Sequence, residues 1–382
     1  MLIKDWKIEK DGDIQEISAL IDGFRLWYRL PRQYRTSKAG DSFLVAALFP
    51  AMSKGEGLEI DSHLTVSPRL LKNTSKLQEI HHCWNPALEI IPIKARTLPG
   101  ESINNGVLTF FSGGVDSSFT FLKHMDEISH AVLINGFDFF LDKGIFMIPI
   151  KRNSQFMQTF NKILIPVETN YYEFGYNYNL SRVLTQTCIL ASIALLLAFP
   201  CVYIPASYSY SQLIPWGSHP LTDPLYSNEG VQIVHDGAEV GRVDKIKRIA
   251  ESELILNNLW VCLKYMDRNC GRCSKCLRTM ITLEILGVKN SNFPAFPSLR
   301  EISSLDWKSD RIFFDEILRL AVQEKNERLK KALLSSKKRY ERMELLKQAD
   351  KVIMGGLVKH IYRKLAKRRN AMRRITVVPD EN

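Results

Sequence analysis

The run Leu108-Thr-Phe-Phe-Ser-Gly-Gly-Val-Asp-Ser-Ser118 contains the strongest indication of fold in this chain. Its first residues are apolar and predict a strand, its two glycines predict a tight turn, and an amphipathic helix is expected from Val115 onward. A strand that ends at a turn and is followed at once by a helix directs several backbone N–H groups at one point. Together with the positive end of the helix dipole, these groups predict an anion site suited to phosphate.

The side chains of this run favour the same interpretation. The serines add hydroxyl donors, Asp116 adds a carboxylate that could hold Mg²⁺, and the glycines let an anion approach the backbone closely. The run does not have the Gly-x-x-x-x-Gly-Lys-Ser/Thr spacing of a Walker loop. A strand, turn and helix with a serine-rich cap and no ligand is the alternative. The expected phosphate-binding residues are Ser112, Gly113, Gly114, Val115, Asp116, Ser117 and Ser118.

Strands alternate with helices from residue 106 onward. Strands are predicted at 107–111, 131–135, 163–167 and 201–205, and helices at 116–125 and 181–199. This alternation predicts an α/β fold with a parallel sheet covered on both faces, in which ligands bind beyond the carboxyl ends of the strands. The glycine turn, the segment Gly136-Phe-Asp138 and the loop from Ala206 all follow such ends, so we expect them to meet at one crevice.

The chain is expected to have three parts. Residues 1–100 predict a β-rich module with strands at 24–30, 42–49 and 88–93, and the break at 98–102 sets its boundary. Residues 101–290 form the α/β domain, and 291–382 form a helical, basic region. His81, His82 and Cys83 in the first part could touch a metal, but adjacent side chains diverge on a helix or a strand, which argues against a site.

Positive charge is concentrated near the C-terminus. The 382 residues carry a net charge of +11; residues 321–382 contain 18 Lys and Arg against 7 Asp and Glu, and the remainder has 34 of each. Apolar residues recur at near-helical spacing around the basic stretch 359–374. Such a helix could bind tRNA or another polyanion, lie on an anionic membrane surface, or dock on an acidic protein.

Targeting signals are not apparent in the sequence. The charged N-terminal residues do not form the apolar core of a signal peptide, and the longest apolar run, 188–202, contains Pro200 and is too short to span a membrane. The 7 cysteines are an odd number, which favours metal binding in a reducing compartment over a disulfide framework. We therefore expect a cytoplasmic protein.

Four of the cysteines follow the pattern C-x7-C-G-x-C-x2-C. Four thiolates at short spacing suit tetrahedral Zn²⁺, and an iron–sulfur cluster is the main alternative. Because cysteine fills all four positions, no site is left open for water, and a structural role is expected. The predicted ligands are Cys262, Cys270, Cys273 and Cys276.

Residues 206–245 predict a long loop with little periodicity, and such loops inside a compact domain are often functional. Its aromatic and polar residues favour substrate binding, and a packed surface loop is the alternative. The candidate substrate contacts are Trp216, His219, Thr222 and Asp223.

The Ser-Gly-Gly-x-Asp-Ser run and the later cysteine pattern together resemble the 7-cyano-7-deazaguanine synthase family of PP-loop ATP pyrophosphatases, over residues 106–286. The resemblance implies a Rossmann-like fold of the adenine nucleotide α-hydrolase class, with ATP and Mg²⁺ at residues 112–118 and Zn²⁺ at the cysteines. It implies that Asp138 lies near the adenine, and that Arg242 or Lys245 contacts the released pyrophosphate.

This family cleaves ATP between the α and β phosphates. The resemblance implies that the chain adenylates a carboxylate, such as 7-carboxy-7-deazaguanine, with Asp116, Ser117 and Arg242 or Lys245 as its catalytic residues. The acyl-adenylate then meets ammonia or an amine and gives a nitrile, an amide or a conjugate.

The resemblance also has a departure. The family's Gly-Tyr-Pro-Asp-Cys-Arg-type segment is replaced by Gly217-Ser-His-Pro-Leu-Thr-Asp-Pro224, which indicates a paralogue with an altered substrate or acceptor. Similar paralogues occur in bacterial anti-phage gene clusters, where the acceptor is a macromolecular amine, so the basic C-terminal region is expected to engage a protein or tRNA acceptor. One alternative is a tRNA-modifying thiolase or amidating enzyme, and a thiolase would need a redox cysteine at Cys188 or Cys201. A second is a non-catalytic nucleotide-binding subunit.

Overall fold

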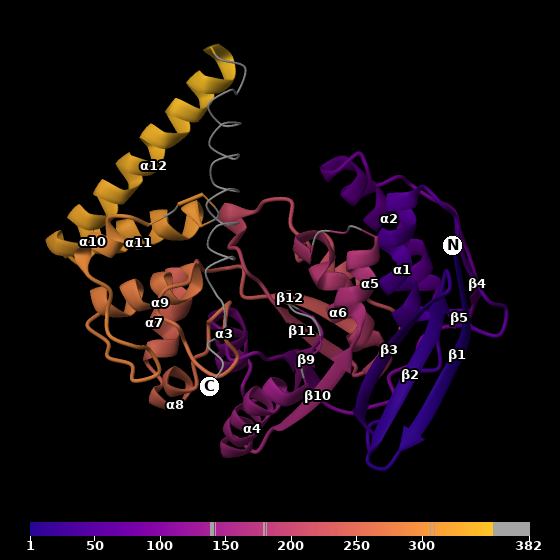
Figure 1. Cartoon of the computed structure of the whole chain (residues 1–382). Coiled ribbons are helices and arrows are strands. Elements are labelled where there is room, and N and C mark those ends of the chain that lie inside the picture. The colour runs from indigo at the N-terminus through magenta and orange to yellow at the C-terminus, as the bar shows by residue number, and fades with distance from the viewer. Residues whose placement is uncertain are drawn as a thin grey trace, which may run out of the picture. The chain divides into compact units, whose positions relative to one another are not determined.

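A ten-stranded mixed sheet forms the centre of residues 1–295 in the computed structural model (Figure 1). The structure describes residues 1–137, 141, 143–178, 180, 182–305, 307–308 and 310–353. The strand order is β12-β11-β8-β9-β10-β3-β2-β1-β4-β6. The strands are β1 (Leu2–Asp11), β2 (Ile14–Ile21), β3 (Phe24–Pro31), β4 (Leu58–Ile60), β6 (Ile93–Lys94), β8 (Val107–Phe110), β9 (Ile128–Asn135), β10 (Ile163–Thr169), β11 (Cys201–Pro205) and β12 (Gln232–Asp236). A separate ladder pairs β5 (Thr65–Val66) with β7 (Arg96–Thr97).

Five neighbouring strands of the large sheet are parallel: β10, β9, β8, β11 and β12. In chain order they run 3-2-1-4-5, so the direction of winding reverses beside β8. In open α/β sheets, ligands bind beyond the carboxyl ends of the strands near such a reversal. The strands predicted at 107–111, 131–135, 163–167 and 201–205 are confirmed within one to three residues at each end.

The N-terminal strands extend this sheet. β1, β2 and β3 form an antiparallel meander, and β3 pairs antiparallel with β10 through Tyr28 and Arg29. Residues 1–295 therefore form one compact unit, and Phe296–Asn382 form another. The expected boundary near residue 100 falls inside the first unit, and the expected boundary near 290 lies close to its end.

Helices cover both faces of the parallel strands, as predicted. Val132 in β9 belongs to the core that contains α1 and α6, whereas its neighbours Ala131 and Leu133 belong to the core beneath α3, α4 and α7. This alternation follows from the two-residue period of a strand. The helices of this unit are α1 (Asp41–Lys54), α2 (Pro68–Trp84), α3 (Val115–Lys123), α4 (Lys143–Thr159), α5 (Tyr171–Asn177), α6 (Arg182–Leu197), α7 (Arg242–Ala250), α8 (Glu253–Asn257) and α9 (Ser274–Ile285).

The prediction of a strand at 42–49 is wrong, because these residues lie in α1. A short run of apolar residues is typical of a buried strand and of a buried helix alike. Here the run continues to Met52 with every residue buried, because α1 packs against α6 as well as the sheet. The strand expected at 88–93 is reduced to the two residues of β6.

The prediction of a loop over residues 206–245 is also wrong in part. Gln232–Asp236 form β12, the edge strand of the parallel group, and α7 begins at Arg242. Short 3-10 turns lie at Tyr210–Gln212 and Asp223–Tyr226. The irregular stretch is therefore confined to about residues 206–231.

The second unit is helical in its described part, as expected. It contains α10 (Leu299–Ile302), α11 (Arg311–Gln323) and α12 (Glu327–Ile353). Its core is built around Trp307, whose ring centroid lies 5.2 Å from that of Phe314. The basic stretch 359–374 lies outside the described residues. Within the part of the chain that is described, no helix combines the length and the apolar character needed to cross a bilayer.

Candidate functional site

The turn between β8 and α3 contains a backbone conformation that favours glycine. Gly113 has φ +80°, a conformation that side chains disfavour. A Cβ atom there would lie 3.4 Å from Asn153 Oδ1, the Asn258 carbonyl oxygen and Trp260 Cβ. The Trp260 N–H donates to the Gly113 carbonyl at 2.7 Å. The segment before the cysteines therefore holds the loop in place from the side opposite to β8.

Hydrogen bonds inside the turn orient its serines. The Ser112 N–H donates to Ser117 Oγ at 3.3 Å, and Ser117 Oγ donates to the Gly114 carbonyl at 3.1 Å. The first N–H groups of α3 have no partner within the helix because they belong to its first turn. Ser118 is buried, and its N–H donates to the Gly114 carbonyl, so it supports the helix from within.

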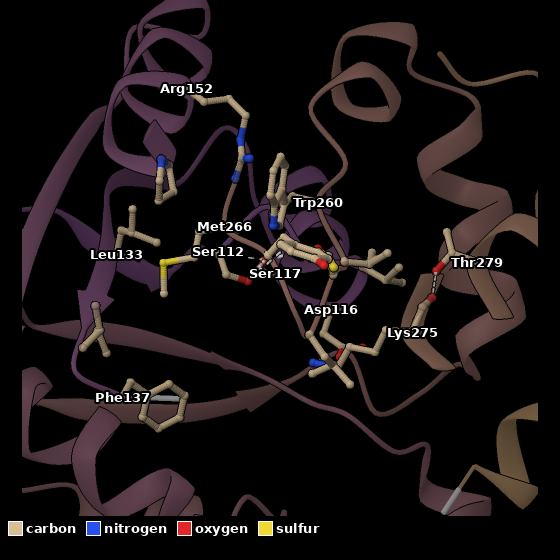
Figure 2. A pocket seen from close by; sticks show the side chains of 18 of the residues that line it. Ser112, Asp116, Ser117, Leu133, Phe137, Arg152, Trp260, Met266, Lys275 and Thr279 are labelled. Carbon is tan, nitrogen blue, oxygen red and sulfur yellow. Dashed lines mark hydrogen bonds between the residues drawn. The ribbon is translucent and has the colours of Figure 1, made fainter. Parts of the chain in front are cut away.

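A cavity of about 190 Å³ opens in front of this turn (Figure 2). The turn, the carboxyl end of β9, α4, α7, α9 and the segment 260–266 form its walls. Of the seven expected phosphate-binding residues, Ser112, Gly114, Val115, Asp116 and Ser117 line it. Asp138, the expected adenine neighbour, lies outside the described residues.

Asp116 is held between two cations. Its carboxylate accepts from Arg242 Nη2 at 2.8 Å and from Lys245 Nζ at 3.3 Å. Burial alone would raise the pKa of Asp116, but the positive charges of Arg242 and Lys245, with smaller contributions from Lys275 and Arg278, outweigh it and lower the pKa. Asp116 is therefore ionised at neutral pH.

Arg242 and Lys245, the two candidates for the cation that contacts pyrophosphate, thus both pair with the carboxylate of Asp116. Arg242 also lines the cavity, whereas Lys245 lies behind it and is 1% exposed. Lys245 Nζ also donates to the Ala206 carbonyl at 2.6 Å, which ties the end of β11 to α7. Burial lowers the pKa of Lys245 more than Asp116 raises it.

The four cysteines of the predicted metal site come together. Their Sγ atoms all lie within 4.8 Å of one another, and those of Cys270 and Cys276 are 4.0 Å apart. Tetrahedral zinc with Zn–S bonds of about 2.3 Å requires sulfur separations of about 3.8 Å. The N–H groups of Arg272 and Cys273 donate to Cys270 Sγ, as they would to a thiolate. The residues therefore fit a zinc ion, and Cys262 also lines the cavity.

The four candidate substrate residues do not line this cavity. Asp223 is fully buried; its carboxylate accepts from Thr187 Oγ1, Ser218 Oγ and the His219 N–H, and it contacts His235 Nδ1. Trp216 Nε1 donates to Gln186 at 3.3 Å, and Thr222 is fully buried. These residues order the irregular stretch, and their contact with substrate stays a prediction.

The adjacent His81, His82 and Cys83 do not gather metal ligands in the described structure, where the cysteine cluster is the one group of that kind found. The His81 ring is buried, with centroids 4.5 Å from Phe49 and 5.0 Å from Trp84. Cys83 is exposed.

Several residues that line the cavity are not among those predicted from the sequence as site residues, and four of them add charge or an aromatic face: Lys275, Arg278, Arg152 and Trp260. Lys275 and Arg278 lie one turn apart on α9, directly after the cysteines, so the cysteine pattern could have indicated them. Arg152 lies on α4 with its guanidinium carbon 3.9 Å from the centroid of the Trp260 ring. No local pattern marks either Arg152 or Trp260, because their contact joins segments more than 100 residues apart.

Comparison of the chain with protein-family models, with curated proteins and with solved structures finds no match in any of the three.

Proposed function

We propose that the chain is an AMP-forming PP-loop enzyme that uses ATP to adenylate a carboxylate. The observation that carries the proposal is the Ser-Gly-Gly-Val-Asp-Ser turn at the end of β8, which opens into a cavity with Asp116 held between Arg242 and Lys245. The 3-2-1-4-5 order of the parallel strands supports a Rossmann-like fold of the adenine nucleotide α-hydrolase class.

The reaction needs positioning and charge neutralisation more than a protein nucleophile. A carboxylate oxygen attacks the α-phosphorus of ATP, the bond from that phosphorus to the oxygen bridging to the β-phosphate breaks, and pyrophosphate leaves. The N–H groups at the start of α3, with the hydroxyls of Ser112 and Ser117, would bind phosphate oxygens. Arg242 and Lys245 would neutralise the departing pyrophosphate, and Asp116 would hold them in place.

Two metal ions are part of the proposal. Mg²⁺ bound with ATP would neutralise phosphate charge. Asp116 is the one carboxylate among the described cavity residues, and both its oxygens already pair with cations. Its first role here is therefore to anchor Arg242 and Lys245. Zn²⁺ at the four cysteines would fix the wall that carries Trp260 and Cys262, which is a structural role.

The substrate and acceptor follow from the family resemblance. We propose 7-carboxy-7-deazaguanine or a related carboxylate as substrate, ammonia or an amine as acceptor, and a function in the cytoplasm, in an anti-phage system. The basic C-terminal region would engage a macromolecular acceptor, either a protein or a tRNA.

The thiolase alternative has less support from the described residues. Cys188 is fully buried, and burial raises the pKa of its thiol to about 12. Cys201 begins β11, at the end of the sheet opposite to the cavity. Neither cysteine lines the cavity. A nucleotide-binding subunit without activity would need no cation pair on Asp116.

The proposal predicts that the protein converts ATP to AMP and pyrophosphate when the right carboxylate is present. Asp116→Ala should lower this rate at least 100-fold, because Arg242 and Lys245 lose their anchor. Asp116→Asn, which keeps the shape, should lower it as well. Asp126→Ala, at an exposed aspartate beyond α3, is the matched control and should leave the rate unchanged. The measurements are AMP release and ATP–pyrophosphate exchange; formation of ADP would refute the assignment.

A further inference from the structure

Arg152 is a half-buried cation whose guanidinium has no anion beside it among the described residues. Its Nε, Nη1 and Nη2 atoms are each inaccessible and have no hydrogen-bond acceptor among the described residues. Its guanidinium lies against the face of Trp260, and burial lowers the pKa of Arg152 to about 10. Stacking on a ring does not replace the hydrogen bonds that a guanidinium loses on leaving water, so the apo protein bears an uncompensated cost.

The place of Arg152 in the cavity separates it from the cations around Asp116. In Figure 2, Ser112 and Ser117 lie between Arg152 and Lys275. Apolar side chains, among them Leu133, Phe137 and Phe146, line the cavity together with Arg152. Because the guanidinium nitrogens are covered in this structure, an anion can pair with them only after a covering side chain moves. The anion would then be desolvated, and its pairing with the guanidinium would be strong.

We propose that Arg152, oriented by Trp260, binds the carboxylate of the substrate that is to be adenylated. This inference rests on the proposed function. In an in-line displacement, the attacking and leaving oxygens lie on opposite sides of the phosphorus. Arg242 and Lys245, which pair with Asp116, serve the leaving pyrophosphate, and Arg152, which pairs with no carboxylate among the described residues, remains for the attacking carboxylate. Its planar fork matches a carboxylate bidentately.

The test separates carboxylate binding from nucleotide binding by calorimetry, without turnover. The probes are ATP with Mg²⁺, inorganic pyrophosphate, and a panel of carboxylates that includes 7-carboxy-7-deazaguanine. Arg152→Met should weaken carboxylate binding about 10- to 100-fold and leave both phosphate probes within about twofold of wild type. Arg152→Lys should also weaken it, because a lysine cannot form the stacked fork.

A matched control lies beside it on the same helix. Lys151 is exposed and does not line the cavity, so Lys151→Met should leave all probes unchanged. Arg152→Met should also keep or raise the melting temperature, because it removes a buried unpaired charge, whereas a structural arginine would lower it when replaced.

Three outcomes would overturn the inference: weakened ATP or pyrophosphate binding with unchanged carboxylate binding, no change for any probe, or no carboxylate binding by the wild-type protein. Carboxylate binding that depends on Arg152 without any AMP release would keep Arg152 as a carboxylate-binding residue and overturn the proposed adenylation instead.

Discussion

At the scale of one residue, the charge state of a buried titratable side chain depends on whether a charged partner lies beside it, as Asp116 and His81 show. Asp116 stays ionised because two cations reach it. His81 has no such partner: it is 1% exposed, and neither ring nitrogen has a hydrogen-bond partner among the described residues. Burial lowers the pKa of His81 to about 4, so the ring is neutral at pH 7.

His81 predicts a pH dependence of stability. Because its pKa falls from about 6.5 in the unfolded chain to about 4 in the fold, the unfolded state binds more protons between these values. The free energy of unfolding is therefore unaffected by protonation of His81 above pH 6.5. It decreases as pH falls toward 4, by about 3 kcal/mol at most. His81→Phe should flatten the free energy of unfolding against pH in this window, measured by urea denaturation. His63→Gln, at an exposed histidine, should leave this pH dependence unchanged. An equal slope of the free energy of unfolding against pH in wild type and His81→Phe would contradict the role given to His81.

At the scale of elements, the site depends on turns that join a strand or a metal segment to a helix. Gly113 lets β8 pass into α3, and Gly271, with φ +65°, lets the cysteine segment pass into α9. A Cβ atom on Gly271 would lie 2.4 Å from Pro294. Both glycines therefore serve backbone geometry, and the side chains around them bear the chemistry.

Gly113→Ala should destabilise the protein by about 1–3 kcal/mol, because alanine disfavours a φ of +80°. It should also weaken ATP binding, since relief of this backbone strain would move the N–H groups of the turn. Gly175→Ala is the matched control: Gly175 lies in α5 at a normal φ, and a Cβ atom there meets nothing within 4 Å. That variant should be neutral or stabilised by up to about 1 kcal/mol. Thermal unfolding measures the stability, and calorimetry measures ATP binding. A Gly113→Ala protein that matches wild type in both would contradict the role given to the positive φ of Gly113.

The cysteine segment should hold about one zinc per chain. Cys273→Ser should lose most of this metal and lower the melting temperature, because the segment that holds Trp260 against Gly113 would loosen. Cys83→Ser, at an exposed cysteine outside the cluster, should keep the metal. Elemental analysis of purified protein decides the matter; iron with visible absorbance in place of zinc would show the iron–sulfur alternative to be correct.

At the scale of the whole molecule, every described residue that lines the cavity lies in residues 1–295. The excess positive charge lies in the second unit, mostly beyond Ile353. The proposed activation chemistry and the proposed contact with a large acceptor thus belong to different parts of the chain.

A fragment of residues 1–295 should therefore retain zinc and AMP release with a small amine as acceptor. It should lose any salt-sensitive binding to RNA or to an acidic protein, because the cationic segment is absent. AMP release and binding at two salt concentrations, compared with the full chain, provide the measurement. Loss of AMP release from a fragment that stays folded would show that the second unit contributes to the reaction.

The features that depend on local chemistry could be predicted from the order of the residues alone. The Ser112–Ser118 run predicted a strand, a glycine turn and a helix, and the cysteine spacing predicted a four-sulfur cluster; the structure contains all of these. The α/β alternation was also readable, because strands and helices have different hydrophobic periods.

The remaining features depend on contacts between segments that are distant in the sequence. The tertiary structure turned residues 41–54 into a helix because α6 and the sheet bury it on all sides, and it brought Arg242, Lys245 and Arg152 from distant segments to one turn. Local periodicity reports which residues are buried but not what they are buried against. Contacts between segments more than 100 residues apart depend on the order and the winding of the strands, and these exist only once the sheet has formed.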